Sequence, residues 1–280
     1  MTFQKIVKVL VFLPAVFLFS AHIAWPESPV LLRYRFQPGQ TLNYRIELKS
    51  QGKMSVGNIP EPVAPESVRQ VNIRFLTVDP AGNAVIEARY AEPQNRIKIG
   101  AQPVPQAAGL PESTVSVVRG RISPSGFFKT ENASPDWNNS VISPLFPELP
   151  SVAVPPGFSW IVRAEESFPA ESPAADFRVQ TIKKYTYLGA AAYRGNSCLK
   201  IVFESRILLP GNPDSRQKTV KPERFSGQGR GEIYLADGRL IASEQESTTE
   251  SEYVIPAFNG SRQSRMVSRG TVAGRAYLLP

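Results

Sequence analysis

Apolar and polar residues alternate strictly along residues 42–49, which read Leu-Asn-Tyr-Arg-Ile-Glu-Leu-Lys. Successive side chains of a β-strand point to opposite faces, so the apolar and the charged residues of this stretch separate. The apolar side chains that share one face are Leu42, Tyr44, Ile46 and Leu48. A strand with one buried and one solvated face is typical of antiparallel sheets. This stretch therefore predicts an antiparallel strand with its apolar face toward a core.

The same alternation recurs along the chain. Apolar residues spaced two positions apart share a face at residues 71–75, 84–90 and 199–203. Asp237-Gly238 separates two further apolar-containing runs, and this dipeptide is a strong hairpin signal because both turn residues take a positive φ. Together with other Gly, Pro and Asn turn clusters, the pattern predicts about ten to twelve strands.

Helix signals are confined to residues 134–149. Ser134 is a suitable N-cap with Pro135 at the first helical position, but Pro144 and Pro147 would end the helix early. The chain has 26 prolines, spread along its whole length, which also opposes an all-α fold. We therefore predict a mainly β protein: a strongly curved antiparallel sheet, as a half-barrel or a sandwich, with at most a short helix around residues 134–149.

The strand pattern divides the chain into two halves that together form one domain. Residues 31–131 make the first β half, residues 132–158 a Pro-rich connection, and residues 159–280 the second β half. If each half were a sheet with one apolar face, the two faces would close on each other or on a shared cavity.

The two halves contain similar short sequences. From Gln70 to Arg119 is 119 − 70 = 49 positions, and from Gln180 to Arg230 is 230 − 180 = 50 positions. The spacings between these points differ, so both an internal duplication and chance reuse of strand sequences stay open.

The N-terminal residues have the layout of a secretory signal peptide. Lys5 and Lys8 precede an apolar run at residues 9–19, and small residues follow it. We predict a signal peptide at residues 1–24 and export to the periplasm or the extracellular space. An uncleaved anchor is an alternative, although the run is shorter than the ~20 apolar residues of a full span. A buried N-terminal helix is another.

Histidine chemistry is excluded from the processed chain, because the only histidine, His22, lies in the signal segment. This removes Ser-His-Asp and Cys-His sites, histidine general bases and histidine-based zinc sites. Ser-x-x-Lys matches at Ser50 and Ser215 do not begin helices, as that catalytic motif requires. We therefore expect no enzymatic activity, no catalytic residues, no metal and no cofactor. A glycan hydrolase with two distant carboxylates is a remote alternative.

The cysteine count and the net charge indicate the cellular environment of the protein and the partners it attracts. A single cysteine, Cys198, permits no internal disulfide, which suits a bacterial exported protein, and we interpret it as a buried, inert thiol rather than a reactive one. The net charge of +8 becomes 8 − 2 = +6 once Lys5 and Lys8 leave with the signal. A basic exported protein is attracted to lipid headgroups, glycans or anionic wall polymer. No Lys/Arg run is dense enough to predict nucleic-acid binding. Membrane contact is expected only through the N-terminal segment, if it is retained.

Two stretches carry a resemblance to a known group of proteins. They are Tyr-Thr-Tyr-Leu-Gly at residues 185–189 and Gly-Glu-Ile-Tyr-Leu-Ala-Asp-Gly-Arg-Leu-Ile at residues 231–241. With the long amphipathic strands, residues 30–276 resemble uncharacterised bacterial exported proteins related to lipoprotein carriers of the LolA/LolB type. The resemblance implies a bent antiparallel sheet over an apolar cavity. This chain lacks the helical lid segments of those carriers.

These observations lead to a non-enzymatic exported envelope protein that binds a lipid or other apolar ligand in the concave face of its sheet. Aromatic residues on strands of the second half are candidates to line the cavity, with ordinary core packing as the alternative. They are Trp160, Tyr185, Tyr187, Phe203 and Tyr234. The alternative function is a structural or protein-interaction component of the cell envelope.

Overall fold

The structure, a computed structural model, describes residues 28–56, 59–90, 94–96, 98–99, 102–103, 116–131, 142–168, 177–209, 221–255 and 264–280. Within these ranges the chain is almost entirely β-strand. The strands of the main sheet are β1 (Thr41–Val56), β3 (Glu66–Val78), β4 (Ala84–Tyr90), β8 (Ser116–Ile122), β9 (Phe128–Thr130), β10 (Ser159–Phe168), β11 (Phe177–Tyr193), β12 (Asn196–Leu208), β13 (Lys221–Ala236), β14 (Arg239–Ile255) and β15 (Ser264–Leu278). Short strands beside it are β2 (Ile59–Val63), β5 (Gln94–Arg96), β6 (Lys98–Ile99) and β7 (Gln102–Pro103).

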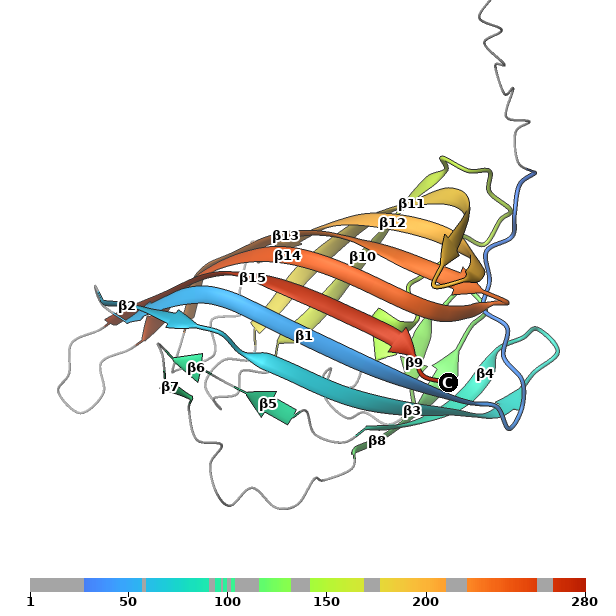
Figure 1. Cartoon of the computed structure of the whole chain (residues 1–280), viewed down its shortest axis with the longest axis horizontal. Helices are drawn as coiled ribbons and strands as arrows, with labels where there is room; N and C mark the ends of the chain where they lie inside the picture. The colour runs from blue at the N-terminus through green and yellow to red at the C-terminus, as the bar shows by residue number, and fades with distance from the viewer. Residues whose placement is uncertain are drawn as a thin grey trace, which may run out of the picture.

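All the strands belong to one curved sheet (Figure 1). Its main path runs in the order β10-β11-β12-β13-β14-β15-β1-β3-β4-β8-β9. The last strand, β15, pairs antiparallel with β1 from Tyr44↔Leu278 to Val56↔Met266, which joins the two halves of the chain into one sheet. No ladder among the described residues connects the edges β9 and β10, so the sheet stays open. The predicted curved antiparallel sheet is confirmed, as a single open sheet rather than a sandwich of two.

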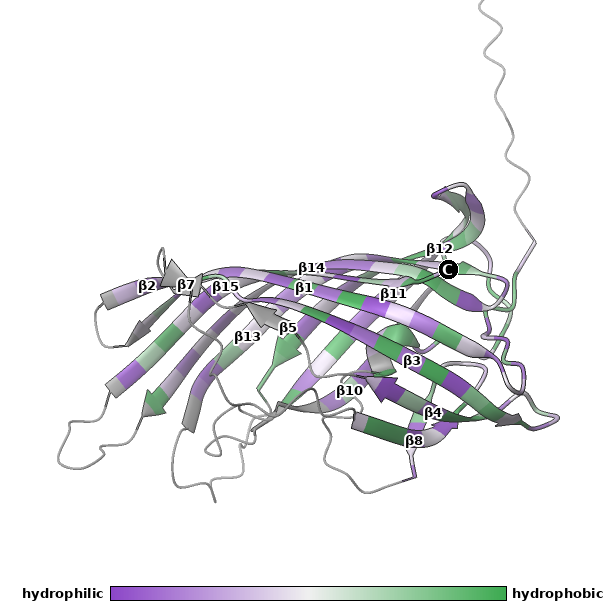
Figure 2. Cartoon of the chain, turned by 60° about the horizontal axis from the view of Figure 1, so that its bottom comes forward, coloured by the Kyte–Doolittle hydropathy of each residue, from purple (hydrophilic) through white to green (hydrophobic). Residues whose placement is uncertain are grey.

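The predicted alternation and the predicted hairpin are both present. Leu42 and Tyr44 are buried on the face that carries the main core, which we call the inner face. The opposite, outer face carries most of the charged side chains, and Figure 2 shows hydrophilic and hydrophobic residues alternating along the strands. At the tip of β13 and β14, Asp237 and Gly238 have φ of 51° and 72°. The hairpin therefore uses the positive-φ turn that the dipeptide predicts.

The main core fills one end of the inner face. Two non-strand segments, residues 28–40 and 142–158, cross this end and insert apolar side chains. Two buried tyrosine hydroxyls form hydrogen bonds between the parts of this core. Tyr34, in segment 28–40, donates to the Pro147 carbonyl of segment 142–158 at 3.1 Å. Tyr44, on β1, donates to the Leu240 carbonyl of β14 at 3.2 Å. Burial raises the pKa of both phenols well above the ordinary value, so both stay protonated donors.

The Pro-rich connection contributes to this core. Its helical part is one turn of 3₁₀ helix, η1 (Ser143–Leu145), which agrees with the expectation of at most a short helix. Ile142, Leu145 and Phe146 are buried there. Residues 132–141, the start of the predicted helix, lie outside the described residues, and so does the predicted signal peptide at residues 1–24.

Glycine allows the sheet to bend inward beyond the core. Gly52 on β1 lies directly opposite Gly270 on β15, and both face inward. A Cβ atom on Gly52 would lie only 2.5 Å from the Arg269 carbonyl oxygen and 2.9 Å from the Gly270 Cα atom. Two backbones this close on the inner side leave no room for side chains, so glycine at these positions permits the curvature.

Candidate ligand-binding face

The inner face continues well past the main core. Two rows of residues lie beyond the core, and each row consists of residues that lie opposite one another on neighbouring strands. We call these two rows the open inner face. The first row is Val162, Lys183, Ser205, Gly229, Ser247, Val272 and Ser50, and the second is Ala164, Thr181, Ile207, Gly227, Thr249, Gly270 and Gly52. Only Val162 of these residues packs against a core cluster among the described residues.

Small and apolar side chains dominate this surface. Seven of the fourteen residues are glycine or serine, and Ile207 and Val272 add branched apolar groups. Leu48, which borders the first row, is 37% exposed although it lies on the inner face. A surface of this kind presents backbone and methyl groups to whatever lies on it, and exposed apolar area favours an apolar occupant.

Lys183 and Thr181 give the face one polar end, on β11. Lys183 lies between Val162 and Ser205 in the register, and it forms no ion pair with any residue that the structure describes. Thr181 is 3% exposed, and its hydroxyl has no hydrogen-bond partner within the described part of the chain. A buried hydroxyl without a partner costs about 1–3 kcal/mol, and a hydrogen bond to a bound molecule would offset that cost.

Four of the five aromatic residues predicted from the sequence lie together on the inner face. Trp160 stacks on Tyr185 at 5.4 Å between ring centroids, and Tyr185 contacts Phe203 at 5.6 Å. Tyr187 is almost completely buried in the main core. Tyr185 and Phe203 are one register step from Lys183 and Ser205, so these rings belong to the core and form the wall at which the open inner face begins.

Tyr234 is separated from the other four aromatic residues and lies on the opposite face of the sheet. Its neighbours Ile233 and Leu235 point into the core, so Tyr234 faces outward. There it stacks on Tyr193 at 4.2 Å and donates a hydrogen bond to Glu232. The sequence contains the signal for this position, because adjacent residues of a strand point to opposite faces and Tyr234 directly follows the inward-facing Ile233.

A second, small core forms around Tyr234. The β11–β12 hairpin has a register shift at Tyr187/Gly189. Tyr193 at its tip packs against the buried residues Cys198, Tyr234 and Ala242, as do Ala236, Ile241 and Tyr277 from the neighbouring strands. Cys198 is 3% exposed, as expected for a buried thiol. Burial raises the pKa of this thiol above its ordinary value.

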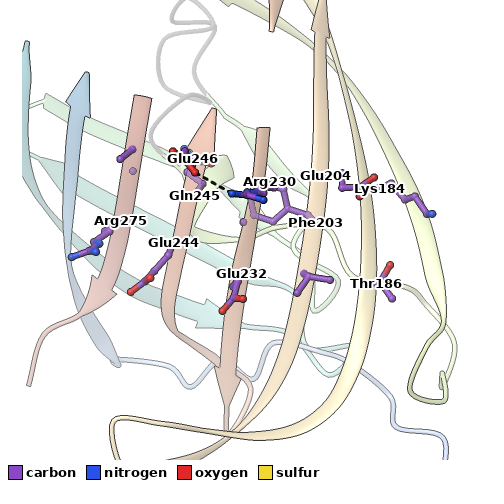
Figure 3. A pocket seen from close by; sticks show the side chains of 14 residues that line it. Lys184, Thr186, Phe203, Glu204, Arg230, Glu232, Glu244, Gln245, Glu246 and Arg275 are labelled. Atoms are coloured by element: carbon purple, nitrogen blue, oxygen red, sulfur yellow. Dashed lines mark ion pairs between the residues drawn. The ribbon is translucent and has the colours of Figure 1, made fainter. Parts of the chain in front are cut away.

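The outer face holds a charged hollow of about 520 Å³ over β11 to β15 (Figure 3). Arg230 and Glu246 form an ion pair across it at 3.5 Å. Glu232 and Glu244 lie directly opposite each other on neighbouring strands. These carboxylates were not nominated by the sequence, because only the register of β13 against β14 makes them neighbours.

The two carboxylates do not have the properties of a hydrolytic pair. Hydrogen bonds from Tyr234 and from Lys200, the latter at 2.9 Å, lower the pKa of Glu232, whereas a general acid needs a raised pKa. Glu232 and Glu244 also stand side by side on one face and do not flank a bond from two sides. Among the described residues no group of three or more His, Cys, Asp or Glu side chains is placed to hold a metal ion.

Comparisons with known proteins establish no family. No family model matches the chain, and no curated protein matches it. Among solved structures, lipovitellin, studied for its lipid–protein interactions, matches with 12% identity and a TM-score of 0.46 over 88% of this chain. This chain spans 26% of the lipovitellin chain.

A second solved structure is a Bacteroides fragilis protein with a YMCC-like fold. It matches with 12% identity and a TM-score of 0.27, over 89% of this chain and 97% of its own. Likenesses at these scores carry no functional conclusion. Neither structure is a carrier of the LolA/LolB type, so that specific resemblance stays a prediction, as does export. Within the described part of the chain, no helix is long and apolar enough to span a bilayer.

Proposed function

We propose that this protein binds an anionic amphiphile, such as a long-chain fatty acid, on the open inner face of its sheet and acts without catalysis. The observation that supports the proposal is an inner face that continues past the core with glycine, serine and apolar residues and only one cation, Lys183, in its two rows.

The apolar part of the ligand would lie along the small-residue rows. At Gly227 no side chain projects inward and an added Cβ would meet its nearest atom at 3.2 Å, so a chain of methylene groups would approach the backbone there. Each methylene that leaves water contributes about 0.8 kcal/mol. Ile207 and Val272 would contact the same chain from either side of the glycines.

The anionic group would lie at Lys183. An ammonium group on a surface whose other side chains are uncharged favours a carboxylate or phosphate, and the Thr181 hydroxyl, two residues away on the same face, would donate to the same group. A hydrogen bond to a charged partner is worth about 1.5–3 kcal/mol, which corresponds to roughly a 10- to 100-fold change in affinity.

The chain provides a matched pair of variants for the test, because Lys183 faces inward and Lys184 faces outward. Binding of a pyrene-labelled long-chain fatty acid and of its methyl ester would be measured by fluorescence titration. We expect Lys183→Met to weaken binding of the acid roughly 10- to 100-fold and to leave the ester unchanged. Lys184→Met should change neither.

Two outcomes would overturn the proposal. One is a purified protein that binds neither probe and carries no lipid in native mass spectrometry. The other is an equal loss of acid binding in Lys183→Met and Lys184→Met, which would place the anion on the outer surface.

A further inference from the structure

The strands β3, β4, β8 and β9 are neighbours in the sheet (Figure 1). Five cationic side chains lie on their outer face. We call this the basic face, and its cations are Arg74, Arg89, Arg119, Arg121 and Lys129, all of them exposed. Arg74 and Arg119 both lie opposite Glu87, on either side of it, and Arg121 lies opposite Lys129. The face is therefore continuous across four neighbouring strands, although the cations are scattered in sequence.

Glu87 holds two of these cations in place. Its side chain is only 7% exposed, and it accepts hydrogen bonds from Arg119 Nε at 2.8 Å and Arg89 Nε at 2.9 Å. The hydrogen bonds from Arg119 and then from Arg89 lower the pKa of Glu87. Because one buried carboxylate anchors two exposed guanidinium groups, both groups keep further N–H donors directed toward solvent.

The charge on this face is unbalanced. Among the described residues, the carboxylates paired with these cations are Glu87 and Glu131, and Glu131 pairs with Arg121 at 3.5 Å. Five cations and two carboxylates leave 5 − 2 = +3, against +8 for the whole chain. On other parts of the outer face, several cations are paired with carboxylates. The pairs are Lys200–Glu232, Arg230–Glu246, Arg265–Glu252 and Arg269–Glu250.

Exposed apolar groups lie among these cations. Val117 lies opposite Arg89 on the same face and is 49% exposed, and Phe127, which directly precedes β9, is 57% exposed. Cations interspersed with an exposed aromatic ring are typical of surfaces that bind at a lipid–water interface, because the ring enters the headgroup layer while the charges pair with phosphates. A soluble anionic polymer would use the charges alone.

We infer that the basic face docks on the surface of an anionic lipid bilayer. This inference goes beyond the proposed function, since it concerns the outer face and a membrane, not a single molecule on the inner face. Each cation near an anionic surface contributes about a fivefold increase in binding. Phe127 would add an apolar contact that does not depend on salt.

The test uses co-sedimentation of the whole chain with phosphatidylcholine vesicles that contain or lack phosphatidylglycerol. We expect binding only to the anionic vesicles, and Arg121→Gln combined with Lys129→Gln should weaken it about 25-fold. The matched control is Arg230→Gln combined with Arg269→Gln, which removes the same charge from the balanced part of the outer face and should have little effect. Phe127→Ala should weaken binding also at high salt.

Several results would overturn this inference. They are equal losses in both double variants, equal binding to neutral vesicles, and binding of soluble polyphosphate with no binding of vesicles. Competition by inorganic phosphate beyond the effect of ionic strength would instead indicate a site for a free anion. The vesicle test is separate from the fatty-acid test, because the Arg121/Lys129 variant should bind the pyrene-labelled acid normally.

Discussion

Replacement of Gly52 by alanine tests whether glycine permits the inward bend of the sheet. The added Cβ would lie 2.5 Å from the Arg269 carbonyl oxygen, and both atoms of this contact belong to paired strands. Real Cβ atoms keep at least 3.0 Å from such a neighbour. To remove this clash, β1 and β15 must separate locally by 3.0 − 2.5 = 0.5 Å or more, which strains the backbone hydrogen bonds that pair the two strands.

The same row contains an internal control. A Cβ on Gly227 would meet its nearest atom at 3.2 Å, and one on Gly270 would meet the Gln51 carbonyl oxygen at 2.8 Å. Overpacking costs about 1–3 kcal/mol, and the reduced freedom of the unfolded chain returns about 0.4–1 kcal/mol. The net change should be a loss of roughly 2 kcal/mol for Gly52→Ala, less for Gly270→Ala, and about zero for Gly227→Ala.

Urea unfolding followed by circular dichroism measures this order. A loss of ~2 kcal/mol corresponds to a midpoint shift of about 0.7 M at a slope of ~3 kcal/mol per molar urea. The accompanying fall in Tm would be about 4–8 °C. If Gly52→Ala were as stable as Gly227→Ala, the close backbone approach would not exist in solution and the account of the curvature would be wrong.

Two further predictions concern Glu87 and Cys198. The pKa of Glu87 is lowered in the folded protein, chiefly by Arg119, so its contribution to stability is present above the ordinary glutamate pKa of about 4.3 and disappears as the pH falls through the lowered value. The wild type should therefore unfold at a higher urea concentration than Glu87→Gln at pH 7, and the two midpoints should converge near pH 3. A difference between the two midpoints that does not change with pH would contradict the ion pair of Glu87 with Arg119. Because burial raises the pKa of the Cys198 thiol, its reaction with a thiol reagent at pH 8 should be at least about tenfold slower in the folded than in the urea-unfolded protein; equal rates would show that the second core is open.

The local structure was largely predictable from the sequence. Alternation identified the inner residues Leu42 and Tyr44, and Asp237-Gly238 identified a hairpin, because side-chain direction and turn geometry depend on only a few adjacent residues. The same rule assigns Lys183 to one face and Lys184 to the other once a strand is drawn there. It would also have placed Tyr234 outside, had Ile233 been used as the reference.

The candidate sites were not predictable to the same degree. Whether Tyr185 lies in a core or a cavity depends on segments 28–40 and 142–158, which reach it from far along the chain. Glu87 shows nothing in the sequence beyond a polar residue on a strand. Its role follows from the register of β4 against β8, which brings Arg119 beside it.

By itself, the sequence determined that this chain forms antiparallel strands with one apolar face, and that no histidine remains once a signal peptide is removed. Only the tertiary structure decided that β15 pairs with β1, that the main core fills one end of the inner face while two rows of small residues lie beyond it, and that five cations form one surface. The reason is physical: alternation has a period of two residues and is written locally, whereas pairing, curvature and charge clustering depend on strands that are distant in sequence and meet only when the sheet forms.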